Sequence, residues 1–249
     1  MGMLYVVLLC AAFVAGVQNA LAGGGSFITF PALLLLGMDA RAANITSTIA
    51  LFPGQVTTGL ANRRLVTGAE GLSFRALVVL SLIGGAVGAL LLLATPPKFF
   101  ELLVPFLVLF ATSVFIWGSF FRNADDTRRR LGPMGAGVAQ FCIAIYGGYF
   151  GGGIGLLMLA ALTLAGLAVR NAGATKNALA SVMNASAVVI FMISGITHWL
   201  AAGVVAVGAI GGGWLGAWAL HRVNERLLRI GVVCIGAALT VAMFVRAYG

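Results

Sequence analysis

Two glycine clusters are the features of this sequence that are best placed to do chemistry. Gly23, Gly24 and Gly25 lie within the charge-free stretch 1–38, and a second triplet, Gly151-Gly152-Gly153, lies within the charge-free stretch 131–169. Glycine destabilises a helix interior by about 1 kcal/mol relative to alanine, so each triplet predicts a broken helix. The free N–H groups and partial positive charge at the start of the resumed helix suit an anion.

Polar and basic side chains follow both clusters, whereas carboxylates are scarce, Asp39 being the exception. A cation carrier would be expected to hold a buried carboxylate, so this composition predicts a site for an anion. The predicted substrate-binding residues are Gly23, Gly24, Gly25, Ser26, Arg41, Asn44, Thr46, Ser47 and Gln55 in the first half, and Gly151, Gly152, Gly153, Arg170, Thr175, Lys176, Asn177 and Asn184 in the second.

Some of these residues also have plain structural interpretations. A serine or threonine in a membrane helix commonly bonds to a carbonyl of its own helix. Arg41 and Arg170 serve equally well as interfacial anchors, and Asp39 as a helix cap or the partner of an arginine. The glycines around 84–88 and 211–216 are better explained by close helix packing than by a site.

The composition places these residues in a lipid bilayer. Of the 249 residues, 61% are hydrophobic and 8% charged, and the mean hydropathy is +1.08. Soluble domains contain about 25% charged residues, so a soluble domain, a disordered chain, a disulfide scaffold and a nucleic-acid-binding module are excluded. The charge-free stretches predict an all-α polytopic membrane protein with about eight hydrophobic helices. The first stretch lacks a basic start, so we interpret it as membrane domain rather than a signal peptide.

The chain also contains an internal repeat. With an offset of 129, Arg41 matches Arg170 and Thr46 matches Thr175, which divides the chain into repeats 1–121 and 132–249 joined by a basic linker, 122–131. Ten of the 15 basic residues lie in the linker and in the loops 63–75 and 222–229, which are therefore expected to be cytoplasmic.

The basic loops fall at different places in the two repeats, as inverted repeats require. Inversion needs an odd number of crossings in each repeat. A re-entrant hairpin at each glycine break would supply it, and both termini would then lie outside.

No arrangement in the sequence predicts catalysis. His198 and His221 lie beside Trp199 and Arg222, without a nucleophile or carboxylate pair. The three cysteines, Cys10, Cys142 and Cys234, lack metal-ligand spacing and are interpreted as small buried apolar side chains. We therefore expect a protein that is not an enzyme and needs no cofactor, metal or nucleic acid.

The paired motifs resemble those of the TauE/SafE family of bacterial sulfite exporters. The first copy runs from Ala22 through the glycine triplet to Gly37 and continues at 42–47; the second runs from 151 to 166 and continues at 171–177. The resemblance covers essentially the whole chain and implies export of sulfite or of an organosulfonate such as sulfoacetate. The second copy departs from the pattern, with Ala160 in place of Pro31 and Lys176 in place of Ser47.

We therefore predict a secondary transporter of the bacterial inner membrane that exports a small sulfur-containing anion by alternating access. Outward movement of an anion is favourable by about 2.3 kcal/mol per charge per 100 mV, so a coupling ion is not required. The expected partners are the anion and the lipid bilayer, and the sequence leaves a homodimer open. An anion channel and a carrier for another oxyanion or a carboxylate are the alternatives.

Overall fold

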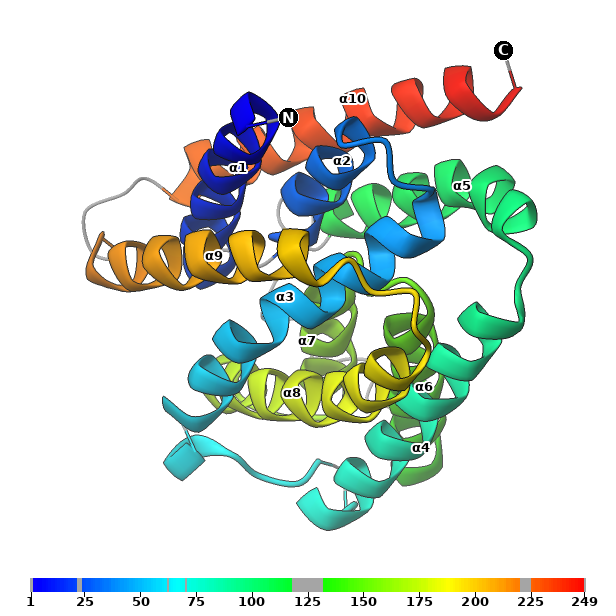
Figure 1. Ribbon diagram of the computed structural model, residues 1–249. Coiled ribbons are helices and arrows are strands. Elements are labelled where there is room, and N and C mark those ends of the chain that lie inside the picture. The colour runs from blue at the N-terminus through cyan, green and yellow to red at the C-terminus, as the bar shows by residue number, and fades with distance from the viewer. Residues whose placement is uncertain are drawn as a thin grey trace.

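The computed structural model describes residues 2–21, 24–61, 63–69, 71–117, 132–219 and 225–248. These residues form helices and turns, with one isolated β-bridge between Ala69 and Leu72, and no strand (Figure 1). In chain order the elements are α1 (Gly2–Leu21), α2 (Ser26–Leu35), α3 (Ala40–Ala61), the 3-10 turn η1 (Arg63–Leu65), α4 (Phe74–Ala94), α5 (Pro97–Ile116), α6 (Pro133–Tyr149), α7 (Ile154–Leu164), α8 (Val169–Ile193), α9 (Trp199–Ala219) and α10 (Glu225–Tyr248).

The all-α prediction is confirmed, and the number of helices is higher than predicted because both glycine-broken stretches form two separate helices. Helices α1 and α2 contain 20 and 10 residues, and α6 and α7 contain 17 and 11. The prediction of about eight counted each broken stretch once. The linker 122–131, Gly23 and His221 lie outside the described residues.

Both breaks have the same backbone conformation. Gly24 and Gly153, which are 129 positions apart, have φ angles of 84° and 73°. A residue with a β-carbon is strained at such angles, whereas glycine adopts them freely. The helices that follow also end alike, because Gly37 and Gly166 have φ angles of 83° and 84°.

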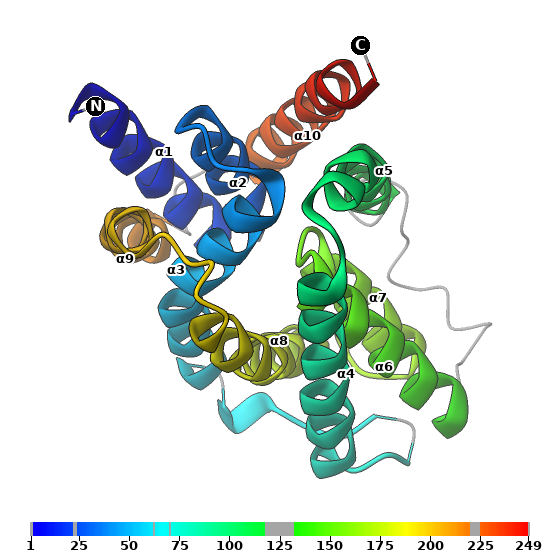
Figure 2. The same ribbon diagram turned by 45° about the vertical axis from the view of Figure 1, so that its right-hand side comes forward.

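The first five helices and the last five pack against each other in a reciprocal way. Figure 2 shows α1 beside α9 on one flank and α4 beside α6 on the other, with α3 and α8 between them. Helix α1 holds the same place in the first five as α6 in the second, and α4 the same place as α9. The first helix of each set therefore packs on the fourth helix of the other.

Glycines allow these helix pairs to approach closely. A β-carbon at Gly88 of α4 would overlap the carbonyl oxygen of Ile145 in α6, and one at Gly212 of α9 would overlap the carbonyl oxygen of Phe13 in α1. Small residues at such crossings are typical of membrane helix pairs. The packing interpretation of these two glycines is confirmed.

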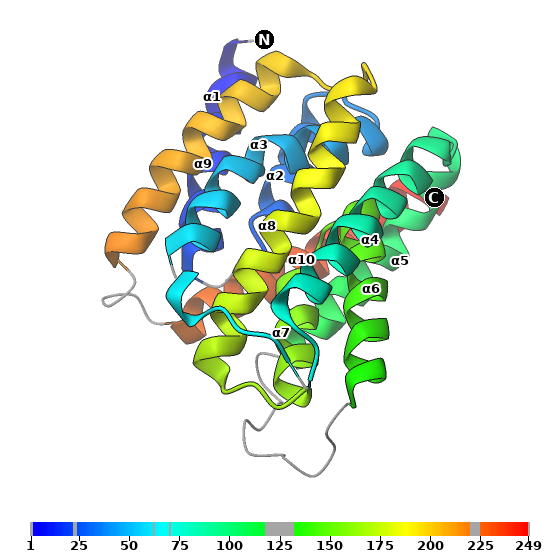
Figure 3. The same ribbon diagram turned by 90° about the horizontal axis from the view of Figure 1, so that it is seen from below.

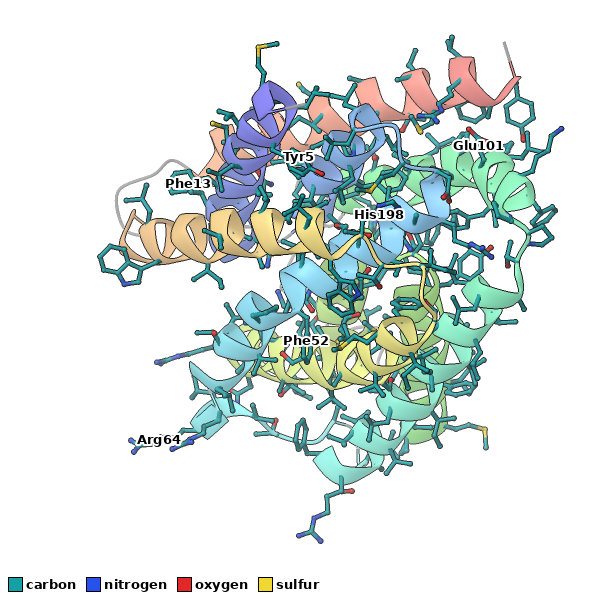
Figure 4. All side chains as sticks on the ribbon, viewed as in Figure 1. Tyr5, Phe13, Phe52, Arg64, Glu101 and His198 are labelled. Atoms are coloured by element: carbon teal, nitrogen blue, oxygen red, sulfur yellow. The ribbon has the colours of Figure 1, made fainter. Side chains whose placement is uncertain are left out.

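The connections separate onto two sides of the molecule. In Figure 3 the N-terminus and the turns after α2, α4 and α8 lie toward the top, whereas η1 and the turn between α7 and α8 lie toward the bottom. Helix α1 runs away from the top and α2 returns to it, so the chain re-enters on the side from which it came. The side chain of Arg64, which belongs to η1, projects away from the helices (Figure 4).

The outer faces of the helices are apolar, as a bilayer requires. The segments Gly2–Asn19, Phe74–Ala94, Pro97–Ile116 and Arg170–Ile193 are each long and apolar enough to cross the hydrocarbon. Large apolar side chains such as Ile193 and Trp214 are about four-fifths exposed. The chain is therefore a multi-pass membrane protein.

The prediction that the three cysteines are buried is wrong. Cys10, Cys142 and Cys234 are exposed on α1, α6 and α10. In a membrane protein an apolar position in the sequence can face lipid as readily as the protein interior, since both are apolar surroundings.

Candidate functional site

A small cavity lies where the first turn of α2 meets the second glycine cluster. It has a volume of about 10 Å³, which is room for about one water molecule. A sulfite or sulfonate therefore requires its walls to move. The cavity is lined by Ser26, Phe27, Phe30, Asn44, Phe150, Gly152 and Leu239.

Asn44 joins α3 to the second break. Its side-chain Nδ2 donates a hydrogen bond of 3.1 Å to the carbonyl oxygen of Tyr149, the last residue of α6. Asn44 is buried and comes from the first half of the chain, whereas Tyr149 and Gly152 come from the second. The two halves therefore build this cavity together.

Both short helices begin without a side-chain cap. The residues before them, Gly25 for α2 and Gly153 for α7, have no side chain that can accept a hydrogen bond from the first turn. The first N–H groups of a helix have no partner within the helix, and they carry its partial positive charge. The start of each short helix is therefore electropositive.

Lys176 adds a basic group beside the second break. A β-carbon built on Gly155 would lie 3.7 Å from Lys176 Nζ and 3.9 Å from its Cδ, so the lysine side chain reaches the first turn of α7. In the described part of the chain no hydrogen bond or ion pair engages this side chain. The position of Lys176 thus combines two positive features without a carboxylate.

Ser47, the residue that matches Lys176 in the first half, has a different environment. Its hydroxyl lies 2.6 Å from the hydroxyl of Thr29, and both residues are buried between α2 and α3. Sequence reasoning did not select Thr29, although its place four residues after Gly25 was a usable signal, because that spacing puts it on the first turn of the resumed helix. The two breaks are therefore alike in backbone and different in charge.

Thr46 and Thr175 do not line the cavity, and each binds a connection between helices of the other half of the chain. The hydroxyl of Thr46 accepts a hydrogen bond of 3.3 Å from the backbone N–H of His198, in the turn between α8 and α9. The hydroxyl of Thr175 accepts one of 3.1 Å from the backbone N–H of Thr67, in the connection between α3 and α4, and donates one of 3.3 Å to the carbonyl oxygen of Thr67. Figure 4 shows His198 beside α3.

Gln55 and Asn184 meet where α3 crosses α8. The Nδ2 of Asn184 donates a hydrogen bond to Oε1 of Gln55, and Ser181 donates one of 2.7 Å to the backbone carbonyl of Gln55. Asn184 is buried, and its Oδ1 has no partner. Asn177, one turn before Ser181, is half-buried, and its carbonyl accepts a hydrogen bond of 2.8 Å from Ser181.

The two predicted arginines lie outside the cavity. Nη1 of Arg41 donates to the carbonyl oxygens of Leu93 and Thr95, at 3.2 and 3.0 Å, so this arginine binds the C-terminal end of α4. Arg170 is exposed. Asp39 caps α3, since its Oδ1 accepts a hydrogen bond of 3.0 Å from the backbone N–H of Ala42.

A larger pocket of about 430 Å³ opens on the side of η1. It is lined by Thr67, Gly68, Asn171 and the four residues 165–168. Its volume lies within the range of small-molecule pockets, about 300–1,000 Å³. The bond between Thr67 and Thr175 therefore lies at the edge of this pocket.

Aromatic rings form part of the wall of the cavity. The ring of Phe150 packs edge-on against Phe30 and Tyr146, with centroid distances of 6.0 and 6.3 Å. Sequence reasoning assigned no role to Phe150. Its place inside the second glycine cluster was the available signal, because Tyr149 and Phe150 are large rings in a run, 147–153, that otherwise consists of glycine.

Several hydroxyls bond only to their own helix, as the structural interpretation predicted. Thr48, Thr163 and Thr240 each donate to a carbonyl three or four residues earlier. Thr46 and Thr175 differ from these because they bond to distant connections.

Comparison with known proteins supports the resemblance found in the motifs. The sequence model described as "Sulfite exporter TauE/SafE" matches residues 8–243. A "Probable membrane transporter protein" of Haemophilus influenzae is 30% identical over 244 residues, which cover 96% of this chain and 94% of that protein. The "Probable membrane transporter protein YfcA" of Escherichia coli K12 is 27% identical over 98% of this chain and 90% of its own length. No solved structure matches this chain.

Proposed function

Because this chain belongs to the TauE/SafE family, we propose that it is a secondary transporter that exports a small sulfur-containing anion across the bacterial inner membrane. The relatives reported above are named as membrane transporters, and the match covers nearly the whole chain. The proposed substrate is sulfite or an organosulfonate such as sulfoacetate, and the proposed mechanism is alternating access.

The observation that carries the choice of an anion is the position of Lys176. Its Nζ lies beside the first turn of α7, about two helical turns into the apolar segment Arg170–Ile193. A basic group at such a depth is costly unless it has a partner of opposite charge, and no described carboxylate supplies one. An anion bound at this place would balance Lys176 and satisfy the free N–H groups of α7.

The proposed binding residues form a centre and a surrounding shell. The centre consists of Gly24, Gly25, Ser26, Asn44 and Gly152, together with Gly151, Gly153 and Lys176 at the second break. Backbone N–H groups of the two short helices would bind the oxyanion, and Asn44 and Ser26 would add side-chain donors. The surrounding shell, which would hold the neighbouring helices in place, consists of Thr46, Ser47, Thr175, Asn177, Gln55 and Asn184.

Alternating access is supported by the contrast between the two cavities. The central cavity holds about one water molecule, whereas the pocket on the side of η1 has a volume of about 430 Å³. A substrate that enters from that side must wait for the centre to open. We further propose that residues 1–121 and 132–249 are inverted repeats joined by 122–131, which accords with the reciprocal packing of their helices.

The proposal is tested with purified protein in liposomes loaded with sulfite, sulfoacetate, sulfate or thiosulfate. Release is followed with and without a membrane potential that is negative inside. We expect selective release of sulfite or a sulfonate, and faster release with the potential because an anion leaves down its electrical gradient. If none of these anions is released, the substrate assignment is wrong.

A channel is distinguished from a carrier in the same preparation. Planar-bilayer recordings of a carrier show no unitary current in symmetrical sulfite, whereas a channel gives discrete conductance steps. Acceleration of release by the same anion on the opposite side is expected only of a carrier.

A further inference from the structure

Two threonines at equivalent positions of the repeat bind the corresponding connections of the opposite half. Thr46 lies in α3 and binds the turn between α8 and α9 through the N–H of His198. Thr175 lies in α8 and binds the connection between α3 and α4 through the backbone of Thr67. Both threonine side chains are fully buried.

The two contacts bind connections on opposite faces of the molecule. Figure 3 places the turn between α8 and α9 toward the top and η1, with the connection that follows it, toward the bottom. Thr46 precedes Gln55 in α3, and Thr175 precedes Asn184 in α8, where these two helices meet while running in opposite directions between the faces. Each contact thus lies between the crossing of α3 and α8 and one face of the molecule.

The contact at Thr175 separates the larger pocket from the positive centre. Thr67 lines the pocket, and Asn171, another lining residue, lies one helical turn before Thr175. The next residue, Lys176, reaches the first turn of α7. An anion that moves inward from the pocket meets the bond between Thr67 and Thr175 before it meets Lys176.

The surroundings of this pocket are basic. Arg63 and Arg64 are exposed in η1, shortly before Thr67, and Arg170 is exposed next to Asn171. Basic groups at the rim of a cavity raise the local concentration of anions. They also mark this side as cytoplasmic, which is the side from which an exporter takes its substrate.

We propose that the contacts of Thr175 with Thr67 and of Thr46 with His198 are the inner and outer gates of the transport pathway, and that the larger pocket is the vestibule in which the anion waits. This proposal rests on the proposed function for the identity of the anion, but not for the gates themselves. Thr46 and Thr175 act as positioning residues that hold a connection closed. Opening one gate while the other stays closed gives alternating access.

The two gates differ in strength. Thr175 makes two hydrogen bonds to Thr67, whereas Thr46 makes one to His198. Replacing each threonine by valine keeps the shape of the side chain and removes the hydroxyl. Thr175→Val is expected to raise the rate at which the centre is labelled from the inner side by about three- to tenfold. Thr46→Val is expected to raise the rate from the outer side by a smaller factor.

The experiment measures access to the centre from each side. Cys10, Cys142 and Cys234 are replaced by serine, and Asn44→Cys supplies one thiol in the central cavity. Inside-out and right-side-out membrane vesicles are treated with a membrane-impermeant sulfonate-bearing thiosulfonate, and the initial labelling rate is recorded. Thr175→Val should raise the rate only in inside-out vesicles, and Thr46→Val only in right-side-out vesicles.

The matched controls are Thr48→Val and Thr163→Val. Both threonines bond only to their own helix, so both variants should be labelled at the same rate as the protein that carries Asn44→Cys alone. Thr175→Ser retains the hydroxyl and should restore the original rate, while Thr175→Ala provides a second variant without it. Monodisperse elution in detergent verifies that each variant is folded.

The assignment of the gates would be contradicted by equal changes in labelling rate from both sides, by a reversed pattern or by no change from either side. The outcome is separable from that of the proposed function. Side-specific labelling in a protein that releases no sulfur anion would support the assignment of the gates and contradict the proposed substrate. Release of sulfite without side-specific labelling would support the proposed substrate and contradict the assignment of the gates.

Discussion

Gln55 and Asn184 are hydrogen-bonded to each other and occupy equivalent positions in the two halves of the chain, 129 residues apart. In inverted repeats, as proposed for this chain, a contact between equivalent residues lies on the axis that relates the repeats. Helices α3 and α8 therefore cross at the centre of the reciprocal arrangement. The paired contacts of Thr46 and Thr175 lie on either side of this crossing.

The amide pair should behave as a coupled unit in stability measurements. Asn184→Leu or Gln55→Leu leaves one amide without its partner and is expected to lower the free energy of unfolding by about 1–3 kcal/mol. The double variant removes both groups and should cost less than the sum of the single variants. Reversible unfolding in mixed detergent micelles measures the three values, and strict additivity would mean that the bond contributes nothing.

Two glycines should respond to alanine with opposite signs. Gly153 has a φ angle of 73°, so Gly153→Ala is expected to lower the free energy of unfolding by about 1–2 kcal/mol. Gly173 lies inside α8, and a β-carbon there would meet no atom within 4 Å. Gly173→Ala should therefore raise stability by up to about 1 kcal/mol. Equal effects in thermal unfolding would show that the bend at Gly153 does not depend on glycine.

Arg41 is expected to act on stability rather than on substrate affinity. Its guanidinium donates to the carbonyl oxygens of Leu93 and Thr95, so Arg41→Met should lower the free energy of unfolding by about 1.5–3 kcal/mol. Exposed Arg170 provides the control, and Arg170→Met should change it by less than about 0.5 kcal/mol. Transport kinetics complete the test, because a raised KM with unchanged stability would make Arg41 a ligand of the anion.

The orientation of the connections is also testable. Arg64→Cys in η1 and Lys98→Cys at the start of α5 place thiols at exposed positions on opposite sides of the molecule, after the three native cysteines are replaced by serine. A membrane-impermeant reagent added to intact cells should label position 98 and not position 64, because basic loops remain cytoplasmic. Labelling of both positions, or of position 64 alone, would contradict the proposed topology.

Much of the local structure is predictable from the sequence because it depends on near neighbours. The glycine triplets predict the breaks, since a run of glycine cannot hold a helix, and Gly24 and Gly153 have the conformation that only glycine adopts freely. The offset of 129 relates Thr46 to Thr175 and Gln55 to Asn184 without any structure. The cap at Asp39 belongs to the same class of near-neighbour effects.

The tertiary contacts are not predictable in this way. That Arg41 binds the end of α4, and that Thr46 and Thr175 bind connections on opposite sides, depends on which helices cross and at what depth. Helices such as α4 and α9 are apolar along nearly their whole length, so hydrophobic patterning does not distinguish the face toward lipid from the face toward protein. The wrong prediction for Cys10, Cys142 and Cys234 has the same cause.

Counterflow of radiolabelled sulfite, in liposomes that contain the wild-type protein, Lys176→Met or Lys176→Arg, tests the central claim most directly. The wild-type protein should exchange sulfite. Lys176→Met should raise the KM at least about tenfold, since the anion loses a charged partner worth about 1.5–3 kcal/mol, and Lys176→Arg should retain most of the affinity. Exchange by Lys176→Met with the KM of the wild-type protein would contradict the account.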